Sequence, residues 1–74
     1  MSTLPRISGR DLASALSKIG YTKDRQKGSH MVLRQSISPH RRIVVPDHRE
    51  VAKGTLSKII KQVGLTVDEF KKLL

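Results

Sequence analysis

The sequence contains no cysteine, few aromatic residues and few acidic ones, and each shortage excludes a class of function. Without cysteine there is no disulfide, no thiolate zinc site and no thiol nucleophile. Tyr21 and Phe70 are the only aromatic residues, which argues against base recognition by aromatic stacking. No stretch approaches the roughly 20 apolar residues of a membrane span, and residues 1–10 lack an apolar run of signal-peptide length. We therefore expect a soluble, cytoplasmic chain.

Positively charged residues dominate the composition of the chain. Fifteen Lys and Arg against six Asp and Glu give a net charge of +9 in 74 residues. Such a surface repels itself unless a polyanion or an acidic protein neutralises it, and solubility alone needs a net charge of only about 2 to 8. The composition therefore predicts a nucleic-acid or acidic partner, bound through backbone and shape rather than through stacked bases. The length suits one domain over residues 1–74.

The first helix is predicted over residues 9–19. Ser8 followed by Asp11 resembles a capping box, and Gly20 supplies a left-handed stop. Apolar residues then recur with the spacing of one helical face: Leu12, Ala15, Leu16 and Ile19.

A second helix with the same apolar spacing is predicted to begin near Thr55 and to stop at Gly64. Its apolar positions are Leu56, Ile59, Ile60 and Val63. Thr66 with Glu69 forms a further capping box, which predicts a short C-terminal helix. The apolar edge of that helix is expected at Val67, Phe70 and Leu74.

Between the first two helices the pattern is that of three short strands. Residues 27–29 and 36–40 are polar and rich in turn formers, so they predict turns in an antiparallel meander. Pro46 ends the third strand because it cannot donate to a ladder, and a polar connection over residues 47–53 follows.

The middle strand predicts which side chains face outward. Met31 and Leu33 alternate with more polar neighbours, so we expect this pair on the helices and His30 with Arg34 on the open face. Val32 is the exception to this alternation. The whole pattern predicts an α+β fold of α-β-β-β-α order, with a three-stranded antiparallel sheet, helices on one face and a short extra C-terminal helix. Double-stranded RNA-binding domains share this order.

His30 is the residue most suited to chemistry. It follows Gly28 and Ser29 in a tight turn, where backbone amides can approach a phosphate closely. Lys23, Arg25 and Lys27 precede it in the same hairpin, and Arg34 lies four residues beyond His30 on the same strand face. RNA carries its own nucleophile, the 2'-hydroxyl, so one histidine with nearby cations could cut it without a metal or other cofactor. From the spacing alone, an ordinary surface histidine is the simpler interpretation.

The other two histidines are weaker candidates. His40 lies in a polar turn and is interpreted as solvated or phosphate-contacting. His48 could cap the second helix, pair with Asp47 or reach the sheet edge, and so is a possible accessory residue. The three histidines are 10 and 8 residues apart without a carboxylate cluster, so no metal site is predicted.

The second helix offers a further phosphate contact. Lys53 precedes it, and Lys58 and Lys61 lie along its polar side. The positive end of a helix favours anions, so these lysines are candidate RNA-binding residues. The alternative is an ordinary solvated helix face.

In these residues and their order, the chain resembles the HicA family of toxin mRNA interferases over nearly its whole length. The resemblance is carried by short motifs whose order and spacing are together specific. These motifs are Ser8-Gly9-Arg10-Asp11-Leu12, Lys18-Ile19-Gly20-Tyr21, Gly28-Ser29-His30, Val45-Pro46-Asp47-His48, Gly54-Thr55-Leu56 and Ile59-Ile60-Lys61-Gln62-Val63-Gly64-Leu65. Arg49 departs from the glycine that commonly follows the position of His48 in the family.

The resemblance implies the toxin of a toxin-antitoxin pair with His30 as the catalytic histidine. It also implies messenger RNA as substrate, and a HicB-type antitoxin that covers the site, with the free toxin expected to be a monomer. Two other functions explain the charge and the fold. One is a non-catalytic double-stranded-RNA-binding module, and the other is a basic surface that docks an acidic protein.

Overall fold

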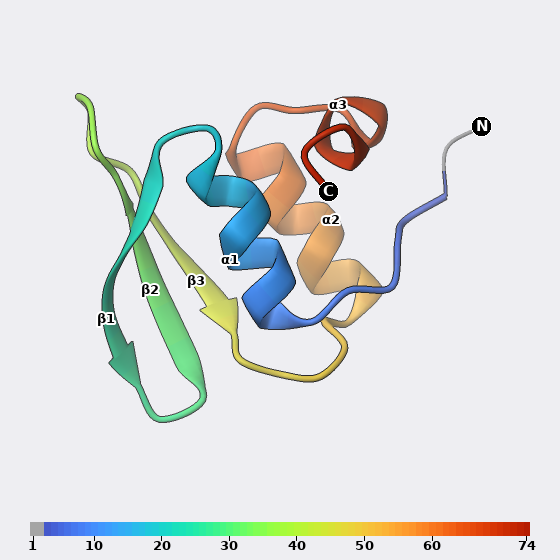
Figure 1. The fold of residues 1–74 in the computed structure, drawn as a ribbon, viewed down its shortest axis with the longest axis horizontal. Helices are drawn as coiled ribbons and strands as arrows, with labels where there is room; N and C mark the ends of the chain where they lie inside the picture. Colours follow the sequence, from blue (N-terminus) through green and yellow to red (C-terminus); the bar gives the residue numbers. More distant parts are fainter. Residues whose placement is uncertain (1–2) are drawn as a thin grey trace.

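The computed structural model describes residues 3–74, so Met1 and Ser2 of the predicted domain lie outside the described residues. Three strands form one layer and the helices cover one face of it, as Figure 1 shows. The elements are α1 (Gly9–Ser17), β1 (Tyr21–Lys27), β2 (His30–Gln35), β3 (Arg42–Pro46), α2 (Lys53–Gln62) and α3 (Val67–Lys71). The predicted α-β-β-β-α order is therefore confirmed.

The sheet is an antiparallel meander with β2 in the centre. On β2, Met31 and Leu33 are 4% and 1% exposed, whereas His30 and Arg34 are exposed to solvent. The alternation predicted from the sequence therefore holds, with the apolar pair facing the helices. Val32 is half-buried on the opposite, open face.

The core lies between the sheet and the helices. It includes the apolar residues that the sequence predicted to be buried on β2, α1 and α2. Its fully buried large side chains are Phe70, Leu12, Leu16, Leu33, Leu56, Ile60 and Val45. Full burial of one such side chain contributes about 1.5–3 kcal/mol, so a set of this size holds a small domain together without disulfides.

Helix α1 begins as predicted but ends earlier. The Ser8 hydroxyl accepts a hydrogen bond from the Asp11 amide at 3.0 Å, which caps the helix. The helix ends at Ser17 rather than at Ile19, because the amides of Lys18 and Ile19 bond carbonyls only three residues back. Gly20 has the predicted left-handed backbone, with φ of 96°.

The two C-terminal helices differ from expectation at their ends. Helix α2 begins at Lys53 rather than near Thr55. Thr66 and Glu69 form the predicted capping box at the start of α3, and Phe70 anchors that helix in the core. Leu74 lies beyond α3 and is 52% exposed, so it does not belong to the buried edge. No helix within residues 3–74 has the length and apolar character that a bilayer crossing requires.

A β-bulge interrupts β1 and changes which residues face outward. Lys23 pairs with Leu33 and Arg25 pairs with Val32, so Asp24 is the extra residue between them. A regular ladder would have placed Asp24 opposite Val32 and Gln26 opposite His30. Because successive residues point to opposite faces, the extra residue moves each later side chain of β1 to the opposite face of the sheet. Arg25 and Lys27 therefore lie on the open face.

Candidate functional site

His30 begins β2 directly after a two-residue turn. Lys27 and His30 are paired across that turn, which consists of Gly28 and Ser29. Gly28 has φ of 60°, and a glycine at the first central position is typical of a type II′ hairpin. The turn thus brings Lys27, Gly28, Ser29 and His30 together, as the sequence predicted. Within residues 3–74, the His30 ring makes no hydrogen bond, so it is open to a ligand.

The neighbours of His30 on the open face are set by the strand register. Lys27 lies directly opposite on one side and Pro46 on the other. Directly opposite side chains share a face and are about 4.5–5.5 Å apart at Cβ. Arg25 is the diagonal neighbour, about 7–8 Å away. The sequence places Arg25 in the same hairpin as His30, but its position on this face depends on the bulge.

Arg34 shares the open face with His30 but lies further along it. Four residues of strand separate the two, which is about 13 Å. Arg42 is paired with Arg34 and adds another cation to the same row. At its paired positions the open face therefore carries four cations and no carboxylate, namely Arg25, Lys27, Arg34 and Arg42.

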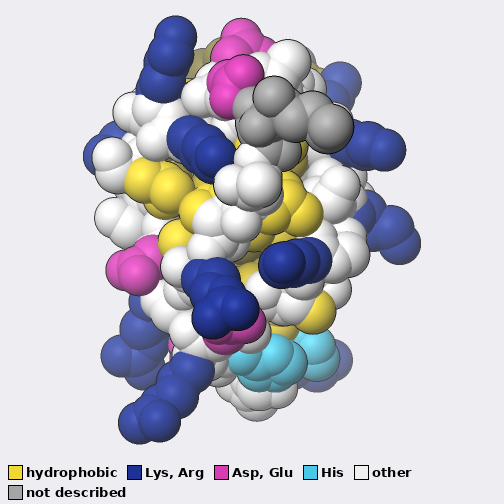
Figure 2. Space-filling view, turned by 90° about the vertical axis from the view of Figure 1, so that its right-hand side faces the viewer, with side chains coloured by type: hydrophobic (Ala, Val, Ile, Leu, Met, Phe, Trp, Pro, Cys, Tyr) yellow, Lys and Arg dark blue, Asp and Glu magenta, His cyan; other side chains and the backbone are white. Residues whose placement is uncertain are grey.

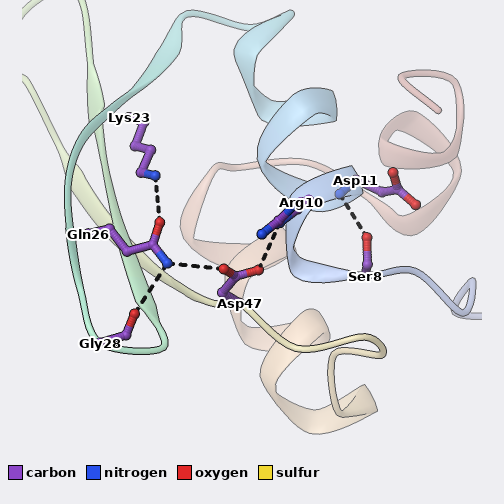
Figure 3. Close-up of polar contacts among 7 residues, drawn as sticks. All are labelled: Ser8, Arg10, Asp11, Lys23, Gln26, Gly28 and Asp47. Carbon is purple, nitrogen blue, oxygen red and sulfur yellow. Dashed lines mark hydrogen bonds and ion pairs between the residues drawn. The ribbon is translucent and has the colours of Figure 1, made fainter.

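Asp47, which directly follows β3, holds the turn between β1 and β2 in place. Its carboxylate accepts a hydrogen bond from the Gln26 side-chain amide at 3.0 Å, and that amide also bonds the Gly28 carbonyl at 3.2 Å (Figure 3). The Asp47 amide donates to the Ser29 carbonyl at 2.6 Å. Arg10 from α1 pairs with the second carboxylate oxygen at 3.4 Å. The network ties the turn before His30 to the start of α1.

The remaining histidines occupy different ends of the molecule. His40 has φ of 57° and its Nδ1 lies 3.1 Å from the Gln35 carbonyl, so it belongs to the β2–β3 turn. His48 follows Asp47 and is exposed, and its carbonyl accepts a hydrogen bond from the Gly9 amide at 2.9 Å. Within the described part of the chain the His48 ring does not bond Asp47, whose carboxylate serves Gln26 and Arg10. Figure 2 shows histidine side chains gathered at the molecule's lower end, where Figure 1 has the β1–β2 turn and the β3–α2 connection.

The lysines of α2 are exposed, and one of them faces a groove. Lys58 lines a groove of about 610 Å³ between β3 and α2 together with Arg42. Lys53 and Lys61 are exposed elsewhere on the helix. Residues 3–74 contain no group of three or more His, Asp or Glu side chains that could hold a metal ion. Tyr21 and Phe70 are both buried, so no exposed aromatic ring is available for base stacking.

Comparison with known proteins gives one match. A family model described as the HicA toxin of bacterial toxin-antitoxin systems matches residues 9–65, which span α1 to the end of α2. Neither the curated proteins nor the solved structures give a significant match. The match covers well over half of the chain and includes the turn, the sheet and both major helices. The chain therefore belongs to the HicA family and is the toxin of a toxin-antitoxin system.

Proposed function

We propose that this toxin is a metal-independent endoribonuclease, an mRNA interferase that acts in the cytoplasm through His30. The observation that carries the proposal is the position of His30 on an open sheet face whose paired positions hold four cations and no carboxylate. A phosphodiester is attracted to such a face, and an imidazole is the side chain best suited to move a proton near neutral pH.

The reaction needs little from the protein. The 2'-oxygen of RNA attacks the adjacent phosphorus, and the bond from phosphorus to the 5'-oxygen breaks, which leaves a cyclic 2',3'-phosphate and a 5'-hydroxyl. His30 removes the 2'-hydroxyl proton or supplies one to the leaving oxygen. Lys27, directly opposite, and the backbone of Gly28 and Ser29 are the nearest groups for the charge that develops on the phosphate.

The other cations serve to bind the strand. Arg34 lies too far along β2 to touch a phosphate at His30, so it is assigned to a neighbouring phosphate. Lys53, Lys58 and Lys61 are assigned to the RNA backbone on α2. An acidic, HicB-type antitoxin that covers the open face would neutralise the same cations and exclude RNA.

The test compares the wild-type toxin with His30→Ala on a labelled single-stranded RNA in the presence of EDTA. We expect cleavage by the wild type alone, with the fold of the variant and most of its RNA affinity retained. His40→Ala is the matched control, because it removes an exposed imidazole in the β2–β3 turn, away from His30. His48→Ala removes the exposed imidazole that follows Asp47. We expect both to cut RNA, which for His48 also tests whether it has an accessory role.

Three outcomes contradict the proposal. Cleavage by His30→Ala rejects this histidine as the catalyst. Loss of cleavage in EDTA rejects the metal-independent mechanism, and cleavage of RNA with a 2'-deoxy sugar at the cut site rejects the 2'-hydroxyl as nucleophile. Binding without cleavage by every protein would favour a non-catalytic double-stranded-RNA-binding module, which the shared fold also allows.

A further inference from the structure

The groove between β3 and α2 runs along the edge of the sheet, next to the open face, and the proposed chemistry does not use it. It has one cation on each wall, Arg42 from β3 and Lys58 from α2, and no carboxylate lines it. Thr55 and Gln62 add neutral polar groups. Its apolar lining consists of Val44, which is 52% exposed, the exposed Ala52 and the nearly buried Ile59.

The groove starts close to His30. Val44 lies on β3 two residues before Pro46, and Pro46 is directly opposite His30. Val44 is therefore the diagonal neighbour of His30 on the open face, at about 7–8 Å. From Val44 the groove continues to Arg42, which is a further two residues along the strand. A strand that passes His30 on the open face therefore reaches the groove at the sheet edge by way of Val44.

We propose that this groove binds the single RNA strand that flanks the scissile phosphate, with Arg42 and Lys58 as its phosphate contacts. The proposal rests on the proposed ribonuclease function and adds the path of the substrate. The cations on opposite walls suit a chain with a charge at every repeat, and Val44 offers an apolar surface to a sugar or a base edge. A groove of about 610 Å³ has room for a short segment of one strand.

The absence of exposed aromatic rings also bears on how the strand is held. Tyr21 and Phe70, the only aromatic residues, are 3% and 0% exposed. Binding in the groove therefore depends on phosphate charge rather than on stacked bases, so it tolerates many sequences and weakens steeply with salt.

The test measures binding instead of cleavage, so that it stands apart from the catalytic proposal. Fluorescence anisotropy would follow single-stranded 2'-O-methyl RNA of increasing length, which lacks the 2'-hydroxyl nucleophile, at several salt concentrations. Arg42→Ala and Lys58→Ala are compared with Lys72→Ala, which removes an equal charge from the C-cap of α3, outside the lining of the groove. We expect each groove variant to lower the salt slope by about 0.7, and the control to leave it unchanged.

Two further comparisons vary the length of the RNA and the kind of ligand. In the wild type, affinity should rise when the RNA becomes long enough to fill the groove, and both groove variants should lose this increment. Equal salt slopes for Arg42→Ala, Lys58→Ala and Lys72→Ala would overturn the proposal. So would a duplex, or an acidic peptide, whose binding depends on Arg42 and Lys58 as strongly as that of single-stranded RNA. Cleavage by His30→Ala would reject the catalytic role while leaving this binding result intact.

Discussion

The Gly9 backbone lies directly against the carbonyl group of Pro46. A Cβ atom at Gly9 would be 1.9 Å from the Pro46 oxygen, and the Gly9 amide donates to the His48 carbonyl at 2.9 Å. Only glycine permits this approach. Because Pro46 is paired with His30, the contact places the first turn of α1 and the proposed catalytic histidine in one rigid arrangement.

Gly9→Ala should destabilise the toxin by about 1–3 kcal/mol, because the new methyl group overlaps backbone that cannot move without shifting the end of β3. Chemical denaturation measures this change in the free energy of unfolding. Gly54→Ala is the matched control, since it adds the same methyl group in α2 where nothing lies within 4 Å. We expect that control to be neutral or stabilising by up to about 1 kcal/mol. Equal effects of the two substitutions would contradict the close contact.

Asp47→Ala should lower kcat more than it raises KM. The substitution removes the acceptor for Gln26, and with it part of the support for the turn before His30. A small displacement of a catalytic group costs on the order of 10- to 100-fold in rate. Asp47→Asn keeps one oxygen acceptor and should recover part of the activity. Steady-state cleavage of a defined RNA measures both constants, and an unchanged kcat in Asp47→Ala would count against a positioning role.

The capping box of α3 should make the stability of the toxin depend on pH in the acid range. Hydrogen bonds from the Thr66 amide and hydroxyl hold the pKa of Glu69 below its ordinary value near 4.5. A carboxyl whose folded pKa is lowered stabilises the fold above its unfolded pKa, and that contribution is lost as the pH falls through the folded value. Stability should therefore decline below about pH 4.5, and Glu69→Gln should remove this part of the decline.

Denaturant midpoints of the wild type and Glu69→Gln across the acid range test this prediction. Thr66→Ala removes the helix cap itself and should cost about 1 kcal/mol at neutral pH. If the midpoints of Glu69→Gln equalled those of the wild type at every pH, Glu69 would not be the source of the pH dependence.

The parts of the fold that follow from local patterns were predictable. Each depends on residues that are close together in the sequence. These features are the apolar spacing of both long helices, the capping residues Ser8 and Thr66, and the outward position of His30. Helix ends were less certain, as α1 and α2 show, because a final 3₁₀ turn or an extra first turn costs little.

The site was only partly predictable because its remaining features join distant segments. The contact of Gly9 with Pro46 and the bonds of Asp47 to Gln26 and Arg10 depend on how β3 and α1 meet. A polar residue in a connection carries no local sign of such a partner. The proposed catalytic motif, Gly28-Ser29-His30, is confined to three consecutive residues, so it could be singled out from the sequence.

The bulge in β1 makes two neighbouring one-residue deletions unequal. Without Asp24, the ladder becomes regular, and Arg25 and Lys27 keep their partners Val32 and His30. Without Arg25, Asp24 should take the position opposite Val32 and bring a carboxylate beside the proposed path of the RNA phosphates. RNA affinity should therefore survive the first deletion and fall after the second. A toxin one residue shorter in β1 can thus present the same cationic face. At this point of the strand, RNA binding therefore depends on which residue is present rather than on the length of the strand.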